Sequence, residues 1–334
     1  MRPSSGDALA EPIAAPTAPE AAPTAPPTPS FARVVLLRLE AAAFLTLALM
    51  AVIFWVRLPL SLPSEDDYRA AAQDIGSRAA QGDAVLLDPH WAERARLFLQ
   101  GTPVLNLARK PVREDLRGYG HVFLLSLPDL PRSDQAGAFT FLESIKFRRA
   151  EEPRRHGRLT VTLFENTELE RPTFDFTSEV AGAQVYIRRP DGSREICPAM
   201  GGRHPCPRAG WINVGEEIKE IDSKPFRCLW AHPAGSEPLV VEYPDAPLGK
   251  TLDVVGGIVG QIVYRHESYG TLTLTVKIDG NLAASVEFPP GVPGERRRAI
   301  DTSAQAGGRH LVQFEVSAPN PDMRHFCFAA EAYP

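Results

Sequence analysis

The sequence predicts a single membrane anchor followed by an α/β domain with a small parallel, Rossmann-like sheet and then an antiparallel β-sandwich. Three observations support this fold class. An uncharged apolar run occupies Ala41–Val56, the segment 63–150 alternates strand-like and helical patterns, and the segment 151–334 has a period of two between Gly- and Pro-rich turns. We therefore expect a tail at 1–33, a transmembrane helix at 34–62, and two folded domains after it.

The anchor prediction rests on length and on the lack of polar residues. With its flanks the apolar run extends from Val34 to Leu62 and reaches the roughly 20 apolar residues that a helix needs to cross a bilayer. A cleaved signal peptide would be shorter and followed by small residues, whereas Phe54 and Trp55 end this run. The absence of any polar face over Ala41–Val56 argues against a core helix of a soluble domain, because such a helix usually exposes one polar side to solvent. The sequence favours an uncleaved anchor over both alternatives.

Charges beside the anchor predict its orientation. Arg33 and Arg38 precede it, and Glu65–Asp67 follow it, with Arg57 as the one dissenting charge. The positive-inside rule then places the N-terminus in the cytoplasm. High Ala, Arg and Pro usage is typical of GC-rich bacteria, so we expect the inner membrane, with the C-terminal domains in the periplasm. The Pro/Ala-rich tail at 1–33 buries too little apolar surface to fold; it reads as a solvated tether, with a Pro-rich recognition motif as the alternative.

The α/β prediction for 63–150 follows from the order of its elements. Ser64 precedes three acids, as at a helix start. Ala84–Leu87 and His121–Leu127 are continuous apolar runs, typical of strands buried on both faces. A helix with an aromatic face is expected between these runs, and a further helix at 135–147. Strands alternating with helices predict parallel pairing through right-handed crossovers.

This order carries a resemblance. An amphipathic helix, then Gly-Asp-Ala-Val-Leu-Leu-Asp-Pro at 82–89, an aromatic-bearing helix and the apolar strand His121–Leu127 resemble the soluble part of membrane glycosyltransferases of the protein-mannosyltransferase and aminoarabinose-transferase type. The resemblance covers about residues 64–150. Those enzymes carry their catalytic acid in a loop between early membrane spans, and this sequence shows no such loop. The resemblance therefore implies a detached accessory domain and argues against transferase activity.

The sandwich prediction rests on many short alternating strands. Leu159, Val161 and Leu163 alternate with threonines, and the segment 271–288 reads as a hairpin that turns at Asp279–Asn281. Such strands between Gly and Pro turns are typical of β-sandwiches.

The end of the chain carries a second resemblance. The apolar Val254–Ile258, a Val-Lys-Ile-Asp-Gly hairpin at 276–280, the strand Ile300–Thr302 and a Gly-rich turn before Val312–Val316 resemble jelly-roll modules of the galactose-binding type. The resemblance covers about residues 226–334 and is one of pattern, without a sugar-site motif. Because such modules often bind glycans, it implies glycan recognition.

All four cysteines follow the anchor, and an even number in an exported domain predicts disulfides. Four cysteines allow three pairings. We favour Cys197–Cys206, which encloses a loop rich in Gly, Pro and His, together with Cys228–Cys327. Trp230, close to Cys228, is expected to pack in the core against this second disulfide.

Catalytic and metal signatures are scarce. Asp88 and His90 follow a predicted strand at its carboxyl end, where α/β sheets place ligand-facing residues, and the alternative is that Asp88 caps the next helix. The same turn lacks the glycines of a pyrophosphate site, and no P-loop, nucleophile elbow or zinc-protease motif occurs. A metal site with His204 and His232 beside the cysteines is the alternative to disulfides, but zinc ligands usually come in closely spaced pairs. We expect no cofactor and no metal.

Exposed aromatic residues are the candidate ligand contacts, because the face of a pyranose stacks on a ring. Tyr264, Arg265, Glu267 and Tyr269 combine two rings with hydrogen-bonding groups just before the hairpin, and Trp211 is a second candidate. The alternative is that Tyr264 packs in the core and that Arg265 and Glu267 form an ordinary surface pair.

These observations predict a membrane-anchored, extracytoplasmic and non-catalytic recognition or accessory protein. Its expected partners are the lipid bilayer and either envelope glycan or a protein of surface-polysaccharide or glycosylation machinery. A net charge of −5 and an isoelectric point near 6.0 give no basis for nucleic-acid binding. The alternatives are a carbohydrate-active enzyme or transferase-related subunit with a site near Asp88 and His90, and a structural envelope spacer. A recognition protein predicts a cleft where polar groups and exposed rings converge, and a spacer does not.

Overall fold

The structure is a computed structural model that describes residues 31–90, 92–106, 112–129, 135–222, 224–260, 263 and 270–334. The chain divides into two compact units, Met1–Leu60 and Ser61–Pro334. Four predicted ligand contacts, Tyr264, Arg265, Glu267 and Tyr269, lie outside the described residues.

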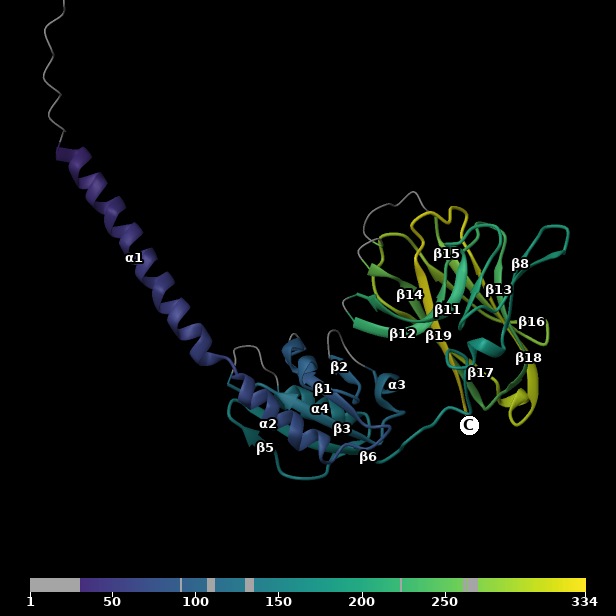
Figure 1. Cartoon of the computed structure of the whole chain (residues 1–334), viewed down its shortest axis with the longest axis horizontal. Helices are drawn as coiled ribbons and strands as arrows, with labels where there is room; N and C mark the ends of the chain where they lie inside the picture. Colours follow the sequence, from purple (N-terminus) through teal and green to yellow (C-terminus); the bar gives the residue numbers. More distant parts are fainter. Residues whose placement is uncertain are drawn as a thin grey trace, which may run out of the picture. The chain divides into compact units, whose positions relative to one another are not determined.

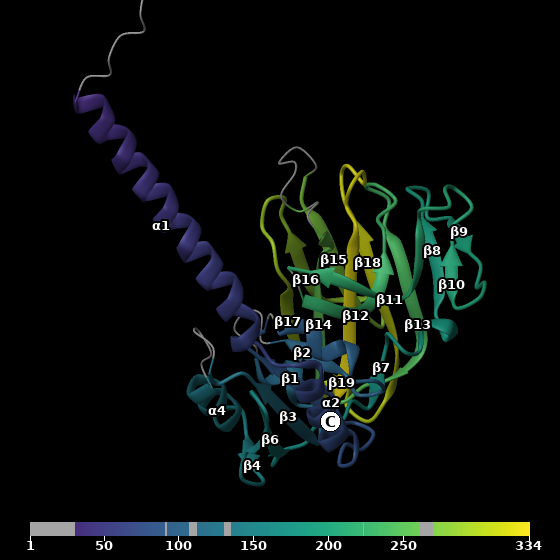
Figure 2. The ribbon, with the colours of Figure 1, turned by 60° about the vertical axis from the view of Figure 1, so that its left-hand side comes forward.

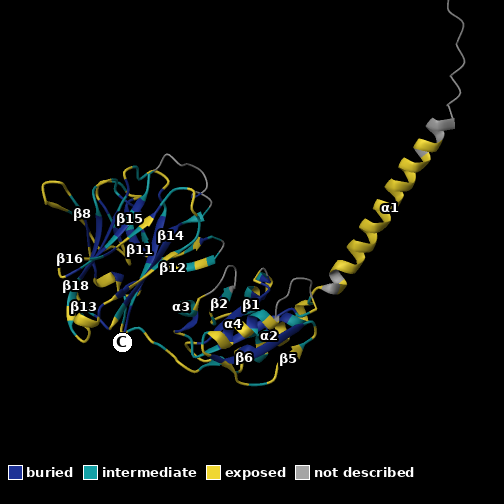
Figure 3. Cartoon of the chain, turned by 180° about the vertical axis from the view of Figure 1, so that it is seen from behind, coloured by how far each residue is buried: buried dark blue, intermediate teal, exposed yellow. Residues whose placement is uncertain are grey.

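The first unit contains one long helix, α1 (Phe31–Ser61). Its most apolar part, Arg38–Leu58, has 21 residues and none of it is buried. At 1.5 Å per residue this part is about 31 Å long, close to the thickness of a bilayer's hydrocarbon core. The described part of α1 is exposed along nearly its whole length (Figure 3), and Trp55 is 80 % exposed. The helix is therefore long and apolar enough to span a membrane, as an uncleaved anchor requires.

The second unit begins with a six-stranded sheet in the order β2-β1-β3-β6-β4, with β5 paired to β6. Strand β1 runs parallel to β2 and β3, whereas β6 is antiparallel to β3, β4 and β5. The predicted parallel sheet is thus present in three strands of a mixed sheet (Figure 1). Its elements are α2 (Glu65–Gly76), β1 (Ala84–Asp88), a 3-10 helix (Glu93–Leu97), β2 (Val104–Asn106), α3 (Arg113–Leu116), β3 (His121–Ser126), α4 (Gln135–Ser144), β4 (Phe147–Arg149), β5 (Arg154–His156) and β6 (Leu159–Asn166).

Helix α2 begins as its sequence predicts. The backbone N–H of Asp67 donates to Ser64 Oγ at 3.2 Å, and the N–H of Ser64 donates to Asp67 Oδ2 at 3.0 Å. This capping box satisfies two N–H groups that the first helical turn leaves without an intrahelical partner. Tyr68, Ala71 and Ile75 on one side of the helix are buried against the sheet.

Two expectations for this region were wrong. Strand β6, assigned from its alternating residues to the sandwich, pairs with β3 instead. Its Leu159 and Val161 pack on one face of the α/β sheet and its Phe164 on the other, so both faces are covered and the alternation does not reveal which sheet the strand joins. The expected helix with an aromatic face between β1 and β2 is only the short 3-10 helix Glu93–Leu97.

The remainder is a sandwich of two antiparallel sheets (Figures 1 and 2). One sheet has the order β10-β11-β12-β19-β14-β17 with β7 paired to β19, and the other has the order β16-β15-β18-β13-β8-β9. The strands are β7 (Phe174–Asp175), β8 (Gln184–Arg188), β9 (Arg194–Cys197), β10 (Arg203–Pro205), β11 (Asn213–Ile221), β12 (Lys224–Ala231), β13 (Leu239–Pro247), β14 (Thr251–Ile258), β15 (Leu272–Ile278), β16 (Asn281–Phe288), β17 (Arg296–Asp301), β18 (Arg309–Ser317) and β19 (Phe326–Tyr333).

Aromatic side chains fill the space between the two sheets. Phe176 contacts Tyr243 and Phe314 edge to face, with ring centroids 4.9 and 5.1 Å apart, and Phe314 lies 5.2 Å from Phe328. The Tyr243 hydroxyl donates to the carbonyl of Phe176 at 2.5 Å, which satisfies its polar end inside the core. Side chains on the opposite, outer face of each sheet point away from this core.

Both disulfides join the cysteines that the sequence analysis favoured as pairs. Cys197–Cys206 closes a short loop with a Cα–Cα distance of 4.2 Å, and Cys228–Cys327 links β12 to β19 at 5.7 Å. His204 is buried, and its ring nitrogens lie 3.4 and 3.0 Å from the carbonyl oxygens of Cys197 and Val180. Among the described residues, no group of three His, Cys, Asp or Glu side chains is arranged to hold a metal ion.

Candidate functional site

A pocket of about 440 Å³ lies on the outer face of the seven-stranded sheet, the face turned away from the core. We call it the aromatic pocket. Two tryptophans and two histidines share it with charged and amide side chains. Its lining consists of Arg203, Trp211, Asn213, Glu217, Lys219, Trp230, His232, Asp322, Met323 and His325.

The alternation of β12 turns Trp230 into this pocket. Leu229 and Ala231 are buried in the core, so Trp230 between them points to the opposite face. On the neighbouring strand β11, Trp230 pairs with Gly215. On the other side of β11, Gly215 pairs with Arg203 of β10. A Cβ on Gly215 would lie 2.8 Å from Arg203 Cγ, so the glycine leaves room for the arginine stem on this face.

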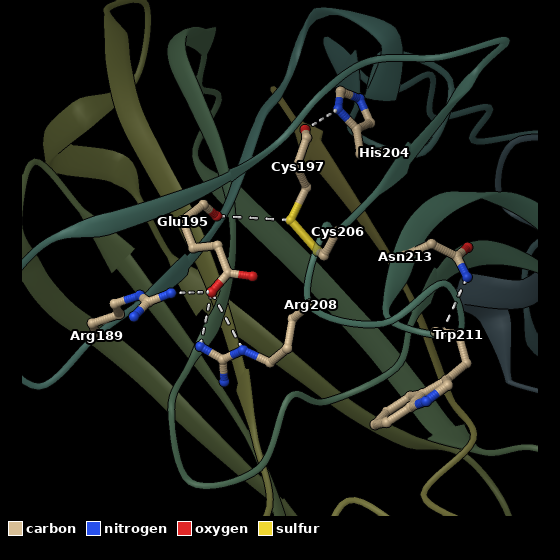
Figure 4. The surroundings of a disulfide bond; sticks show 8 residues. All are labelled: Arg189, Glu195, Cys197, His204, Cys206, Arg208, Trp211 and Asn213. Atoms are coloured by element: carbon tan, nitrogen blue, oxygen red, sulfur yellow. Dashed lines mark hydrogen bonds and ion pairs between the residues drawn. A yellow bond between two sulfur atoms is a disulfide. The ribbon is translucent and has the colours of Figure 1, made fainter.

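The loop that follows the first disulfide positions Trp211 (Figure 4). The Cys206 N–H donates to the carbonyl of Ile212 at 2.9 Å, and the Asn213 amide donates to the carbonyl of Trp211 at 3.2 Å. Close to the disulfide, Glu195 binds Arg208 at 3.0 Å and Arg189 at 2.8 Å. These contacts, together with the burial of Cys206 and Ile212 in the main core, hold the loop in place.

The four rings form one continuous cluster. The centroid of Trp211 lies 4.7 Å from that of His232, and His325 lies 5.4 Å from Trp230 and 5.5 Å from His232. The Lys219 ammonium is 4.6 Å from the centre of Trp230, within range of a cation–π contact. Trp211 remains 50 % exposed and so offers a ring to a ligand.

Both histidines of the pocket are neutral at pH 7. Burial lowers the pKa of His232 to about 4 and also lowers the pKa of His325. Nδ1 of His232 lies 3.1 Å from the carbonyl oxygen of Pro233, so in the neutral ring Nδ1 carries the proton and Nε2 is an acceptor. The two rings therefore act as uncharged hydrogen-bonding groups.

The fixed charges of the pocket largely compensate each other. Glu217 binds Arg203 at 2.6 Å and also pairs with Lys219, and Asp322 adds an exposed carboxylate at the rim. Because these opposite charges are paired, the pocket has little net charge, and the paired groups can still form hydrogen bonds to a ligand. The pocket thus combines apolar ring faces with donors and acceptors, which suits a neutral, hydroxyl-bearing ligand.

The structure places the two tryptophans differently from their sequence assignments. Trp211, a candidate ligand contact, lines this pocket, and its contact with a ligand stays a prediction. Trp230 was expected in the core and instead lies on the outer face. The assignment to the core failed because Cys228, on the same side of β12 as Trp230, is buried with Ile221 and Cys327 in a small cluster separate from the main core. The period of two between Leu229 and Ala231 was the signal that could have revealed Trp230.

Asp88 and His90 lie apart from the aromatic pocket. Asp88 ends β1 and is buried, its carbonyl accepting from the Leu127 N–H at 2.9 Å, whereas His90 is exposed. A catalytic role for this pair stays a prediction.

No protein-family model matches the chain, and no curated protein matches it. Several solved structures of carbohydrate-binding modules are similar. The CBM51-2 domain in complex with GlcNAc and INT domains from Clostridium perfringens ZmpB share 12 % identity at a TM-score of 0.28, over 55 % of this chain and 46 % of that one. CBM51 from Clostridium perfringens GH95 in complex with methyl-galactose shares 12 % at 0.24, over 34 % and 78 %.

A carbohydrate-binding module CBM36 in complex with calcium and xylotriose shares 15 % identity at a TM-score of 0.21, over 35 % of this chain and 87 % of that one. This chain covers only 26 % of the length of a structure with the CBM51-2 and INT domains of Clostridium perfringens ZmpB. It covers 36 % of the length of a structure with tandem CBM51 modules from Streptococcus pneumoniae. TM-scores this low assign neither a family nor a ligand to this chain. The transferase resemblance of 64–150 and the jelly-roll assignment of 226–334 stay predictions.

Proposed function

We propose that this protein is a membrane-anchored recognition protein whose aromatic pocket binds envelope glycan without cleaving it. The observation that carries the proposal is the convergence of the half-exposed Trp211 with Trp230, two neutral histidines and compensated charges. A sugar has an apolar face and a rim of hydroxyls. The tryptophan rings of the pocket can stack on the apolar face, and its polar side chains can form hydrogen bonds to the hydroxyls. A spacer has no need of such a surface.

The rest of the chain supports this role. Helix α1 has the length and composition of a membrane span, and the disulfides fit an oxidising compartment. With the charges beside α1, this supports an inner-membrane anchor with the folded unit in the periplasm. The α/β domain would then be a non-catalytic support in surface-polysaccharide or glycosylation machinery.

Binding of the purified full chain in detergent to an array of envelope glycans tests the proposal, followed by calorimetric titration of the best ligand. Trp211→Ala removes the exposed ring and is expected to weaken binding about tenfold, the effect of losing about 1.4 kcal/mol of aromatic contact. Leu282→Ala, at another exposed apolar residue, on β16 of the other sheet, is the control and should bind normally. Unchanged binding in Trp211→Ala would refute the assignment of the pocket.

We propose the segment 264–269 as a second contact region for the same glycan, because Tyr264 and Tyr269 offer further rings and Arg265 and Glu267 further hydrogen bonds. Tyr264→Ala and Tyr269→Ala measured in the same titration test this part. Wild-type affinity in both variants would remove the segment from the site and leave the aromatic pocket alone.

A further inference from the structure

Two neighbouring arginines of the sandwich carry charges that no other side chain compensates. The side chains of Arg296 and Arg298 on β17 are exposed and form no ion pair or hydrogen bond with any described residue. Every other described arginine from Phe174 onwards has a carboxylate or carbonyl partner. These partnered arginines are Arg188, Arg189, Arg194, Arg203, Arg208, Arg227, Arg297, Arg309 and Arg324. Unpaired arginines are therefore the exception in this domain, and the two of them lie close together.

Both arginines lie on the same side of β17. Ile300 is buried in the core between the sheets, so the alternation of the strand places Arg298 and Arg296 on the side of Ile300. Arg297, between them, points to the opposite face, where it binds Asp253 at 2.6 Å. At about 3.3 Å per residue the Cα atoms of the two unpaired arginines are about 7 Å apart, a distance at which like charges repel each other. A bound anion would relieve this repulsion.

A hollow of about 420 Å³ lies beside these arginines. We call it the arginine hollow. It lies where β16 and β17, the last strands of the two sheets, come together at the edge of the sandwich (Figures 1 and 2). Its lining consists of Ser285, Val286, Glu287, Arg296, Arg297 and Arg298. Ser285 and Glu287 are exposed, and their side chains also form no ion pair or hydrogen bond with any described residue. The hollow therefore offers two guanidinium groups, a hydroxyl and a carboxylate to a ligand.

We propose that the arginine hollow binds an acidic sugar residue, whose carboxylate or phosphate group is held by Arg296 and Arg298. A guanidinium group donates two parallel N–H bonds to either kind of anion. Glu287 can accept hydrogen bonds from the sugar hydroxyls, and Ser285 can both donate and accept them. The proposal deepens the glycan recognition proposed above and rests on it for the choice of a sugar over another anion.

The arginine hollow and the aromatic pocket are separate sites. In the seven-stranded sheet β12, which carries Trp230, and β17 are separated by β19 and β14. Three strand spacings of about 4.8 Å place β12 and β17 about 14 Å apart, which is more than the length of one sugar ring. The arginine and the lysine of the aromatic pocket are paired with Glu217, whereas Arg296 and Arg298 are unpaired. A glycan that fills both sites therefore contains neutral and acidic residues.

Two other roles for the unpaired arginines make different predictions. An anionic membrane surface also attracts arginines, but a surface of uniform negative charge would repel Glu287 in the same lining, whereas a single sugar can place its hydroxyls there. Charged side chains on an outer strand can also prevent a sheet from pairing with another molecule. That second role needs no hollow, and it predicts self-association when the arginines are removed.

Calorimetric titration of the full chain in detergent with glucuronate, glucose 6-phosphate and glucose tests the proposal. The three probes share the sugar ring and most of its hydroxyls, and only the first two carry an anionic group. The wild type is expected to bind each acidic sugar about tenfold more tightly than glucose, the effect of one hydrogen bond to a charged group. Because the arginines are exposed, this preference should shrink at high salt. Arg296→Ala/Arg298→Ala should abolish the preference.

Arg148→Ala/Arg309→Ala is the matched control, because it removes the same charge from two exposed arginines that have carboxylate partners. This control should keep the preference for acidic sugars. Thermal unfolding of the same samples shows that each variant is folded. Equal binding of the three probes by the wild type, or a preference that survives in Arg296→Ala/Arg298→Ala, would overturn the proposal. A surviving preference together with self-association of that variant would assign the arginines to edge protection.

Two competitors test which kind of anion the hollow prefers. Inorganic phosphate that binds as tightly as glucose 6-phosphate would overturn the assignment to a sugar. Phosphatidylglycerol that displaces glucuronate when it is added to the detergent micelles would overturn it in favour of a membrane surface.

Trp211→Ala separates this proposal from that of the aromatic pocket. It should weaken the binding of neutral glycan and leave the preference for acidic sugars intact. Arg296→Ala/Arg298→Ala should remove the preference and leave the binding of neutral glycan intact, so either site can fail without the other.

Discussion

Protonation of His232, which lines the aromatic pocket, is expected to destabilise the sandwich. The side chain is 5 % exposed, and burial lowers its pKa from 6.5 to about 4. The unfolded chain binds the His232 proton more tightly than the folded chain does. The stability that comes from keeping His232 neutral is therefore complete above pH 6.5 and is lost as the pH falls towards 4. The loss is on the order of 3 kcal/mol for a shift of this size.

Denaturant unfolding of the full chain between pH 4 and 7 measures this effect. His232→Phe keeps a ring in the pocket and removes the titration, so its stability should change less with pH than that of the wild type. His90→Gln, at an exposed position, should follow the wild-type profile. A His232→Phe variant as acid-sensitive as the wild type would show that another group is responsible.

Glu331 is predicted to oppose folding at neutral pH. Burial and neighbouring carboxylates raise its pKa, so the folded state binds this proton more tightly than the unfolded state does, and stability falls as the pH rises through the pKa of the folded state. Glu331→Gln should therefore be more stable at pH 8 by about 0.5 kcal/mol, the size of an unfavourable cross-strand charge pair, and equal to the wild type at pH 4. Melting at the two pH values measures the difference, and equal stability at pH 8 would contradict it.

At the scale of elements, the two disulfides are predicted to differ in what they do. They close loops of 99 and 9 residues in sequence separation, and the chain-entropy model gives the longer loop about 2 kcal/mol more stabilisation. Cys228→Ser/Cys327→Ser should therefore unfold at lower denaturant than Cys197→Ser/Cys206→Ser, measured in the same detergent.

The short disulfide is expected to matter more for binding. Its loop orders Trp211 through the Cys206 to Ile212 hydrogen bond, so Cys197→Ser/Cys206→Ser should weaken glycan binding and should destabilise the protein less than Cys228→Ser/Cys327→Ser does. Loss of the long disulfide, between β12 and β19, should lower stability more and glycan binding less. Equal effects of the two double variants on both measurements would contradict this division.

The strands differ in how far the sequence could predict them, and the reasons are physical. The hairpin of β15 and β16 is confirmed, with its turn at Asp279–Gly280, because alternation and turn chemistry are local. Its register shifts between Val276 and Lys277, and Leu282, which strict alternation puts on the inner face, is exposed. Strand β6 was placed in the wrong sheet because alternation does not identify a pairing partner. The aromatic pocket draws on β10, β11, β12 and the segment 322–325, which only the pairing of β12 with β19 brings together. Of its rings, the sequence could indicate Trp211 alone.

At the scale of the whole molecule, the prediction concerns the side of the membrane on which the folded unit lies. Helix α1 supplies one span of about 31 Å over Arg38–Leu58, and basic residues precede it while acids follow. A protein that binds envelope glycan must present the sandwich outside the cytoplasm, and the disulfides form there. Alkaline phosphatase fused after Pro334 should be active, and a green fluorescent protein at the same position should be dark. Arg33→Glu/Arg38→Glu, which removes the charge bias, should produce a mixture of both signals. A fluorescent, phosphatase-inactive wild type would place the sandwich in the cytoplasm and remove the glycan from its reach.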